Sequence, residues 1–415
     1  MRHHPPHTGR AALWIAAWPI LAVFVLSNAA TPLYGLWQRE IGFSTGTLTV
    51  VFACYIAGLL GSLLFAGALS DRIGRKHVLL PALALAALAS VLFAFADSVP
   101  ELAAARLLTG VTVGATVSAG MAAVADVAGP ARKAQGSLLA STAMVLGAGL
   151  GPLLAGAVSE TLPGPTSAVF VIELVLLTLA FAVVARLPLP TRTSPTGPRL
   201  RLPSVPAASH GRLAAGIAVF APGITATSFV LSLGPTLLGE LLGATSRTAA
   251  GAMAFAMFAA ATGVQFAVRG LSVRRILITG ALATVASMAA LAIAVGTSSA
   301  AALVLAALLA GGGQGLGQLG GLTLLATNVP GERLAGANAA LNGGGYLLAG
   351  SLPVAAGYLS AAVGLTAGAT VFAAVLAGLA LLGLLVIGKG ATAGSPRGAG
   401  RPVDRGQPEA AGVGR

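Results

Sequence analysis

Charged residues are scarce in this sequence. Asp, Glu, Lys and Arg account for 8% of the 415 residues, whereas hydrophobic residues account for 56% and the mean hydropathy is +0.90. Soluble proteins usually carry about 25% charged residues, so this chain could not cover a water-exposed surface, and an ordinary cytosolic enzyme is excluded. Disorder requires low hydrophobicity and high charge, and it is excluded as well. The remaining class is a polytopic membrane protein.

Cysteine is almost absent, and so are common catalytic motifs. Cys54 is the single cysteine, which excludes an intramolecular disulfide and a cluster of thiolate metal ligands. Neither H-E-x-x-H nor G-x-S-x-G occurs. Residues 315–320 and 383–390 come close to nucleotide-binding motifs, but neither run links a strand to a helix, and glycines inside an apolar segment favour close helix packing. We therefore expect no enzymatic activity, no catalytic residue, no metal site and no cofactor.

Long apolar runs make up most of the chain. A membrane-spanning helix needs about 20 mainly apolar residues, and twelve segments meet this length. The first is longer than the apolar core of a signal peptide, about 7–15 residues, so we expect it to be retained. The sequence predicts an all-α polytopic membrane protein with twelve transmembrane helices, at 11–33, 45–68, 77–96, 102–127, 134–160, 166–187, 212–239, 247–268, 275–296, 300–328, 333–360 and 364–388.

The predicted spans divide into two halves. Residues 11–187 and 212–388 each hold six spans, and at an offset of 201 residues Arg132 aligns with Arg333 and Pro152 with Pro353. Two pseudo-symmetric six-helix bundles of parallel topology are typical of an alternating-access transporter. The remaining segments are predicted to be a cytoplasmic N-terminal segment, a linker rich in Pro, Ser and Arg, and a disordered Gly-, Pro- and Arg-rich tail, at 1–10, 188–211 and 389–415.

The basic residues give the orientation. The net charge is +13, from 24 Lys and Arg against 11 Asp and Glu. With twelve spans, 21 of these 24 basic residues fall on the side that holds both termini; Arg39 and Arg247 fall on the other side, and Arg106 lies within a span. The positive-inside rule places the basic side in the cytoplasm. We expect a multi-pass plasma-membrane protein with both termini cytoplasmic, and the basic excess does not indicate a nucleic-acid partner.

The loop after the second predicted span carries a family signature. Residues 67–76 read GALSDRIGRK, which closely resembles the signature G-x-L-x-D-R-x-G-R-K of the major facilitator superfamily. With the twelve spans and duplicated halves, the resemblance covers nearly the whole chain. It implies that these residues act in a conformational switch, in which Asp71 helps to latch the two halves near Glu332 and Arg333. The residues assigned to the switch are Gly67, Asp71, Arg72, Gly74, Arg75 and Lys76.

Physical chemistry leaves two readings of this loop. Arg75 and Lys76 can meet anionic lipid headgroups, and Asp71 can bind a cation or a helix N-terminus. The alternative is a solvated basic loop without a role in switching.

The fifth predicted span is similar to the glycine-proline motif of the drug:proton antiporter branch of that superfamily. The matching residues are Gly147, Gly151, Pro152 and Gly156. Pro152 removes a backbone hydrogen bond and kinks the helix, while the glycines allow a close helix crossing. Ala143 and Ala155 stand where the branch usually has glycine, so generic small-residue packing is the alternative.

Two ionisable residues are candidates for proton coupling. Arg106 is similar to an intramembrane arginine of the family and is expected to tune the protonation of a nearby acid; alternatively it extends outward to water, since Glu101 is close in sequence. Glu173 is the acid that lies well inside a span and is the leading proton carrier. The alternatives for Glu173 are a structural partner or a protonated, lipid-facing residue. The sixth helix of each half is usually peripheral in this family, and the first span lacks the acid that many family antiporters carry there.

The family architecture places spans one, four, seven and ten around the substrate cavity. Neutral groups in an apolar wall suit a hydrophobic or amphipathic solute, although each can instead bond a neighbouring helix. The polar candidates on those spans are Asn28, Thr31, Thr116, Thr225, Thr227, Ser228, Gln314 and Gln318.

The sequence favours a secondary active transporter. We expect proton-coupled efflux of small hydrophobic or amphipathic molecules by alternating access, in a protein that acts as a monomer in a bilayer with anionic headgroups and uses protons as the coupling ion. The alternatives are an uptake permease or uniporter for a small neutral metabolite and, as a minor possibility, a membrane receptor or assembly factor that does not transport.

Overall fold

The computed structural model describes residues 10–189, 209–242, 246–268 and 270–392. Within these ranges the chain is helical and contains no strand, and twelve helical stretches are long and apolar enough to cross a membrane. The predicted all-α fold with twelve spans is confirmed. In chain order the elements are α1 (Arg10–Ala29), η1 (Thr31–Leu33), α2 (Tyr34–Ile41), α3 (Thr45–Ile73), α4 (Arg75–Phe95), α5 (Val99–Ala115), η2 (Thr116–Gly120), α6 (Met121–Ala128), η3 (Pro130–Arg132), α7 (Lys133–Thr161), α8 (Pro165–Arg186), α9 (His210–Leu242), α10 (Arg247–Ala267), α11 (Val273–Thr297), α12 (Ala300–Ala326), α13 (Gly331–Val363) and α14 (Leu365–Thr392).

The first span is longer than predicted. The sequence places its end at residue 33, whereas the helical path continues through η1 and α2 to Ile41. Pro32 in η1 has no backbone N–H, so it breaks the α-helical hydrogen-bond pattern without ending the span. The path ends at Gly42, whose φ of 80° lets its N–H bond the carbonyl oxygen of Gln38 at 3.0 Å. The prediction from hydropathy ended the span before α2 because residues 38–40 are polar.

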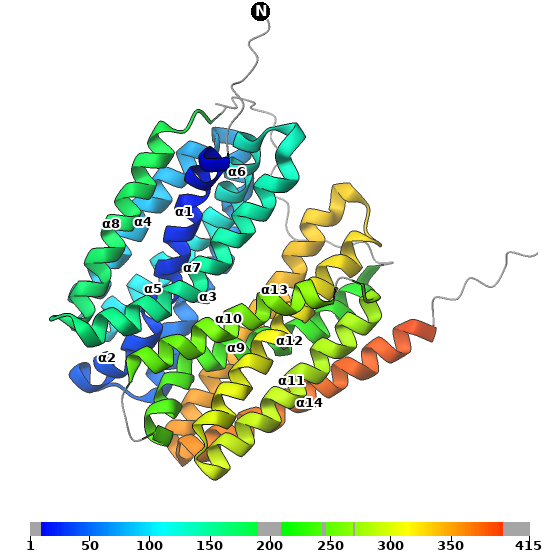
Figure 1. The fold of residues 1–415 in the computed structure, drawn as a ribbon. Helices are drawn as coiled ribbons and strands as arrows, with labels where there is room; N and C mark the ends of the chain where they lie inside the picture. Colours follow the sequence, from blue (N-terminus) through cyan, green and yellow to red (C-terminus); the bar gives the residue numbers. More distant parts are fainter. Residues whose placement is uncertain (1–9, 190–208, 243–245, 269, 393–415) are drawn as a thin grey trace, which may run out of the picture.

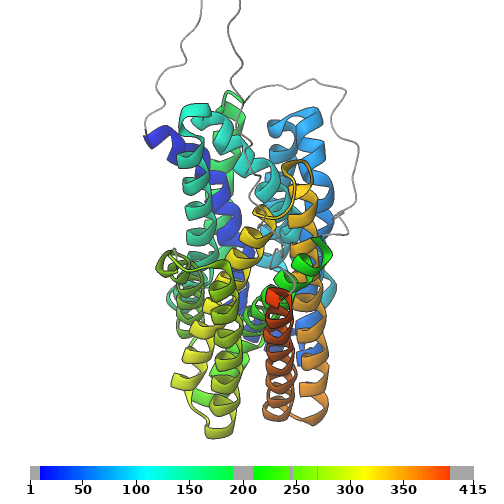
Figure 2. The ribbon, with the colours of Figure 1, turned by 90° about the vertical axis from the view of Figure 1, so that its right-hand side faces the viewer.

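The helices form two bundles, α1–α8 and α9–α14, which are inclined to each other in Figure 1 and lie one above the other in Figure 2. In the first bundle α1 packs on α7, α3 on α5 and α4 on α8. The equivalent pairs of the second bundle, α9 with α13, α10 with α12 and α11 with α14, pack in the same way. The predicted pseudo-symmetry is therefore present. Most of the predicted N-terminal segment, linker and tail lies outside the described residues, at 1–9, 190–208 and 393–415.

Glycines set the closest helix crossings in both bundles. A Cβ atom on Gly110 of α5 would clash with the backbone of α3 at Tyr55 and lie 2.8 Å from the nitrogen of Leu59. In the second bundle Gly311 and Gly315 of α12 meet the backbone of α10 in the same manner. The glycine run at 315–320 thus serves helix packing, as predicted, since small residues let membrane helices approach closely.

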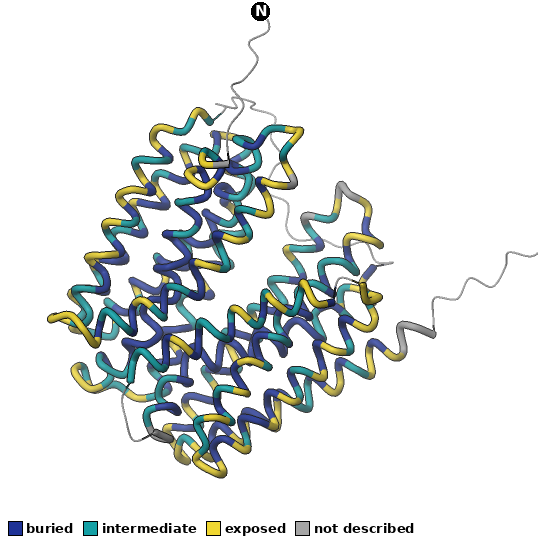
Figure 3. Tube along the Cα trace, viewed as in Figure 1, coloured by how far each residue is buried: buried dark blue, intermediate teal, exposed yellow. Residues whose placement is uncertain are grey.

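The outward faces of both bundles are apolar. Figure 3 shows that burial is concentrated between the helices of each bundle and that exposed residues follow the outer sides of the peripheral helices. On α8 these include Val171, Ile172, Val175 and Leu179, and on α14 they include Leu385. Exposed rows of large aliphatic side chains fit contact with lipid chains.

Two ends of the molecule are distinguished below. The basic face is the end at which α3 meets α4, where Arg72, Arg75 and Lys76 lie. The opposite face is the end that carries α2 and the start of α10.

Candidate functional site

The two bundles meet through α7 and α10. A Cβ atom on Gly156 of α7 would clash with the backbone at Arg247, and one on Gly251 of α10 would clash with the carbonyl group of Pro152. A Cβ atom on Gly149 would lie 3.0 Å from the ring of Phe255. The helices of different bundles are therefore in direct backbone contact at these positions.

Hydrogen bonds between polar groups also link α7 to α10 at this crossing. The Arg247 side chain donates from Nε to the hydroxyl of Ser159 at 2.9 Å and from Nη2 to the Ser159 carbonyl at 2.6 Å. Glu160 accepts hydrogen bonds from the backbone N–H groups of Arg247, at 2.5 Å, and Thr248, at 3.2 Å, and from the Thr248 hydroxyl. A carboxylate at the N-terminus of α10 also matches the positive end of the helix dipole. The bundles are therefore linked by backbone packing and by charge.

A second contact between the bundles, the crossing of α3 and α13, also lies toward the opposite face. A Cβ atom on Gly46 of α3 would meet the ring of Tyr358 at 2.7 Å, and one on Gly350 of α13 would meet Ile56 at 3.4 Å. All these contacts lie in the halves of the four helices nearest the opposite face, whereas the bundles diverge toward the basic face (Figure 1). The structure is therefore closed at the opposite face.

The residues of the glycine-proline motif divide between two partners. Cβ atoms on Gly147 and Gly151 would clash with the backbone of α1 near Leu21 and Val25, whereas Pro152 and Gly156 lie against α10. One helix, α7, thus binds its own bundle through one pair of residues and the other bundle through the second pair.

The signature loop forms an ion-pair cluster inside the first bundle. Arg75 pairs with Asp71 at 2.5 Å and with Asp126 of α6 at 3.5 Å, and it donates to the Ser70 hydroxyl at 3.0 Å. Asp126 was not among the predicted residues, because its partner is 51 positions away and only the fold brings them together.

The other loop residues surround this cluster. Gly74 has a φ of 97°, which favours glycine, and it joins α3 to α4. A Cβ atom on Gly67 would lie 3.9 Å from Ser118 of η2. Lys76 donates to the carbonyl of Ala185 on α8, and Arg72 is exposed.

The predicted latch between Asp71 and the start of span eleven is not formed in this conformation. The ion pair of Asp71 lies within its own bundle, and Arg333 is exposed. The reason is geometric: the bundles are apart at the basic face, so Asp71 and Arg333 do not meet. The side chain of Glu332 lies outside the described residues.

Replacement of Asp71 by asparagine is expected to slow transport by about fivefold or more with expression preserved, because it removes one carboxylate that holds Arg75 and biases the switch. Initial transport rates in proteoliposomes measure this. Asp97→Asn, at an exposed position on the opposite face, is the matched control. Equal rates for the Asp71 variant and wild type would remove the loop from the switch.

Arg106 lies fully buried in the first bundle. Its Nε donates to the hydroxyl of Tyr34, and its Nη1 donates to the Ser27 carbonyl at 2.7 Å. The guanidinium carbon lies 5.2 Å from the ring centroids of Tyr34 and Phe52 and 5.6 Å from that of Tyr55, within the range of cation–π attraction. Within the described residues no carboxylate pairs with it. The interpretation that Arg106 extends outward to water is wrong.

Glu173 lies inside the first bundle. The residue is 2% exposed, so the lipid-facing interpretation is wrong, and its Oε1 has no hydrogen-bond partner within the described residues. Its helix α8 packs on α1, α4 and α7. One turn earlier, Phe170 stacks on Phe93 at 4.9 Å and on Trp37 at 6.3 Å between ring centroids. Glu173 therefore sits beside an aromatic cluster, on a helix that packs within its own bundle.

The predicted cavity residues differ in how their polar atoms are satisfied. Thr225 and Thr227 bond the backbone of their own helix, and Asn28 bonds Ser27 and, at 3.4 Å, the carbonyl of Ala148 on α7. Ser228 is buried and Gln318 is partly buried.

Three of the predicted residues retain a buried polar atom without a hydrogen bond in the described part of the protein. They are Thr31 in η1, Thr116 in η2 and Gln314 in α12. Thr116 begins a π-helical turn, a feature often found at functional sites. Asn338 of α13 also has a buried oxygen without a hydrogen bond. Its signal in the sequence is an amide in a mainly apolar helix that also contains Asn342, on a span that the family architecture does not place at the cavity.

Comparison with known proteins identifies the family. A family model described as Major Facilitator Superfamily matches residues 13–274. The chain is 38% identical over 104 residues to the 3-(3-hydroxy-phenyl)propionate transporter of Escherichia coli K12 and 36% identical over 105 residues to the multidrug resistance protein MdtL of Shewanella sp. ANA-3. Each alignment covers 25% of this chain and 26% of the relative, so the chain matches about a quarter of the length of these relatives.

The fold of a solved transporter agrees. The crystal structure of a bacterial homologue of the human lysosomal transporter Spinster superposes with a TM-score of 0.72 at 14% identity, covering 93% of this chain and 98% of that one. The chain therefore belongs to the Major Facilitator Superfamily and is a multi-pass membrane transporter, not an enzyme.

Proposed function

We propose that the protein is a proton-coupled exporter of small hydrophobic or amphipathic molecules that works by alternating access. The observation that carries the proposal is the seal formed by α7 on α10. Pro152 and Gly156, from a motif similar to that of drug:proton antiporters, lie in that seal while the bundles diverge at the basic face. The similarity to the multidrug resistance protein MdtL supports the same assignment.

The orientation follows from the distribution of charge. The side predicted to hold 21 of the 24 basic residues is proposed to face the cytoplasm, with both termini there and the protein in the plasma membrane. The structure then corresponds to the state that takes up substrate from the cytoplasm. Rocking of the bundles would release it on the other side.

The substrate class follows from the unsatisfied neutral groups. Thr31, Thr116 and Gln314 offer buried hydrogen-bonding atoms without protein partners. Buried polar atoms are normally satisfied, so a ligand is their natural partner. Hydroxyl and amide groups among apolar side chains favour a molecule that is largely apolar and carries a few hydrogen-bonding atoms.

Proton coupling is assigned to Glu173 and Arg106. Within the described part of the chain, these two are the buried residues of the acidic and basic types. They border a common element, α2: Tyr34 accepts from Arg106, and Trp37, one turn later, stacks on Phe170 beside Glu173. Binding of a proton neutralises Glu173, which changes the cost of burying it. That change in charge can move α2, which also borders α9 of the other bundle.

Glu173→Gln is expected to flatten the dependence of transport rate on pH, because the amide cannot take up or release a proton. The measurement is the transport rate in proteoliposomes between about pH 5.5 and 8.5, compared with Glu101→Gln, a carboxylate at the opposite-face end of α5. If the Glu173 variant keeps the pH profile and the proton coupling of wild type, Glu173 is not the carrier.

The direction of transport is tested in inside-out membrane vesicles loaded with an acidic interior. An exporter coupled to protons accumulates a hydrophobic fluorescent dye in such vesicles, and an uncoupler abolishes the accumulation. A panel of dyes, antibiotics and metabolites identifies the substrate. Transport that proceeds equally well without a pH gradient would overturn the proposal.

Uptake of a small metabolite is the alternative, and one relative is named as a transporter of such a metabolite, 3-(3-hydroxy-phenyl)propionate. In that case right-side-out vesicles accumulate a small metabolite, and inside-out vesicles with an acidic interior do not.

A further inference from the structure

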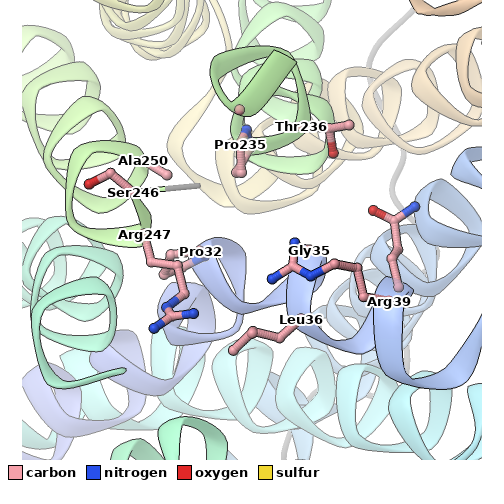
Figure 4. A pocket seen from close by; sticks show the side chains of 11 residues that line it. Pro32, Gly35, Leu36, Arg39, Pro235, Thr236, Ser246, Arg247 and Ala250 are labelled. Carbon is pink, nitrogen blue, oxygen red and sulfur yellow. The ribbon is translucent and has the colours of Figure 1, made fainter. Parts of the chain in front are cut away.

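A cavity of about 330 Å³ lies between the two bundles at the opposite face (Figure 4). One wall comes from η1 and α2, and the other comes from the end of α9 and the start of α10. Its volume is within the range of small-molecule sites. Pro32, Leu36, Pro235 and Ala250 form apolar parts of the wall. Thr31, Thr116 and Gln314, the unsatisfied groups assigned to the transported substrate, are not among the residues that line this cavity, although Thr31 directly precedes Pro32 in η1.

Two arginines bring positive charge to this cavity. Arg39 comes from the first bundle and Arg247 from the second, and Figure 4 shows the Arg39 side chain extending alongside Gly35 into the space between the walls. They are the two Lys or Arg residues that the span assignment places on this side of the membrane. The two basic residues predicted on this side of the membrane therefore line the same cavity, one from each bundle.

In the described structure Arg39 has no ion pair, whereas Arg247 lies close enough to Glu160 for their charges to attract without a direct side-chain contact. Among the described residues the ion pairs are formed by Arg75, and the Arg247 side chain donates hydrogen bonds to the two neutral oxygens of Ser159. Of the nearby acids, Glu160 is directed to the backbone N–H groups of α10, and Glu40 is exposed. The side chain of Glu240 lies outside the described residues. The guanidinium group of arginine can donate two parallel hydrogen bonds to a carboxylate, so an anion is the natural ligand.

We propose that this cavity binds a small organic anion, one carboxylate on an apolar body, and that the bound anion holds the opposite face closed. The carboxylate lies between Arg39 and Arg247, and the body packs on the apolar wall. Opening of the opposite face separates the two arginines, because they belong to different bundles, so the anion binds the closed state more tightly. The bound anion therefore slows transport, and this effect does not depend on which substrate is transported.

Binding is tested with benzoate on the purified full chain, without a pH gradient or transported substrate. Benzoate is expected to raise the thermal unfolding midpoint, and benzamide, of the same shape without the charge, is expected to bind about tenfold or more weakly. Arg39→Gln is expected to weaken benzoate binding by a similar factor. Arg274→Gln, which removes one exposed charge at the basic face, is the matched control and is expected to bind benzoate like wild type.

Arg39 suits this test because its side chain has no hydrogen bond or ion pair in the described structure, whereas loss of Arg247 would also loosen the contact with Ser159. Arg247→Lys, which keeps the charge, is expected to retain measurable binding. Equal affinity for benzoate and benzamide, or equal benzoate affinity in the Arg39 and Arg274 variants, would overturn the proposal. The outcome is independent of proton coupling, so its failure is distinguishable from failure of the proposed function.

Discussion

Replacement of Gly251 by valine is expected to lower transport by about tenfold or more, whereas the same change at Gly263 on the same helix is expected to leave it within about twofold of wild type. A Cβ atom on Gly251 would clash with the Pro152 carbonyl of the other bundle, whereas a Cβ atom on Gly263 meets nothing within 4 Å. Both changes carry the same cost in helix propensity, so their difference isolates the contact between α7 and α10. The valine prevents closure of the opposite face and removes one of the two states of the cycle.

Initial transport rates of both variants, normalised to protein in the membrane, measure this effect. The thermal unfolding midpoint of the purified proteins separates loss of closure from loss of folding: we expect both variants to fold, because the clash is relieved by separation of the bundles. Similar rates for the two variants would show that the contact of α7 with α10 is not part of the cycle.

Arg106→Lys is expected to reduce transport by about tenfold or more, although it keeps the charge. The guanidinium bonds Tyr34 and the Ser27 carbonyl through different nitrogens while it faces three aromatic rings. A lysine ammonium is a single point and lacks the planar fork that makes these contacts together. The variant therefore loosens the junction of α1, α2 and α5, where the first span changes direction.

The control for this variant is Arg186→Lys, at the exposed end of α8, which is expected to transport at close to the wild-type rate. The readouts are the maximal rate, the substrate concentration at half-maximal rate and the pH profile. A role in positioning proton transfer lowers the maximal rate and shifts the pH profile, whereas a purely structural role lowers the unfolding midpoint and leaves the pH profile unchanged. A wild-type rate for Arg106→Lys would show that charge alone is required.

The fold was predictable because its signals are local or periodic. Apolar runs mark the twelve spans, and the alignment of Pro152 with Pro353 marks the repeat. The extension of the first span to Ile41 was missed because α2 is polar at 38–40, and helix formation there depends on packing of Tyr34 and Trp37, which are buried, and not on overall hydropathy.

The site was predictable only in part because its contacts join distant residues. The motif at 147–156 was recognised, but its division between α1 and α10 follows from the three-dimensional crossing. Glu160 and Arg247 were both placed on the same side of the membrane, yet they are 87 residues apart, and nothing local pairs them. The latch of Asp71 depends on the state of the transporter, which a sequence does not specify.

Alternating access requires the two faces to open in turn, and distances across both faces measure this directly. In a Cys54→Ser background, spin labels at the exposed positions Thr161 and Thr297 report on the opposite face, and labels at Ser137 and Ser272 report on the basic face. At rest we predict a short distance across the opposite face and a long one across the basic face. Substrate with a pH gradient is predicted to populate a second state in which both distances are reversed. Distances that stay fixed during transport, or that lengthen together, would contradict alternating access by rocking of the two bundles.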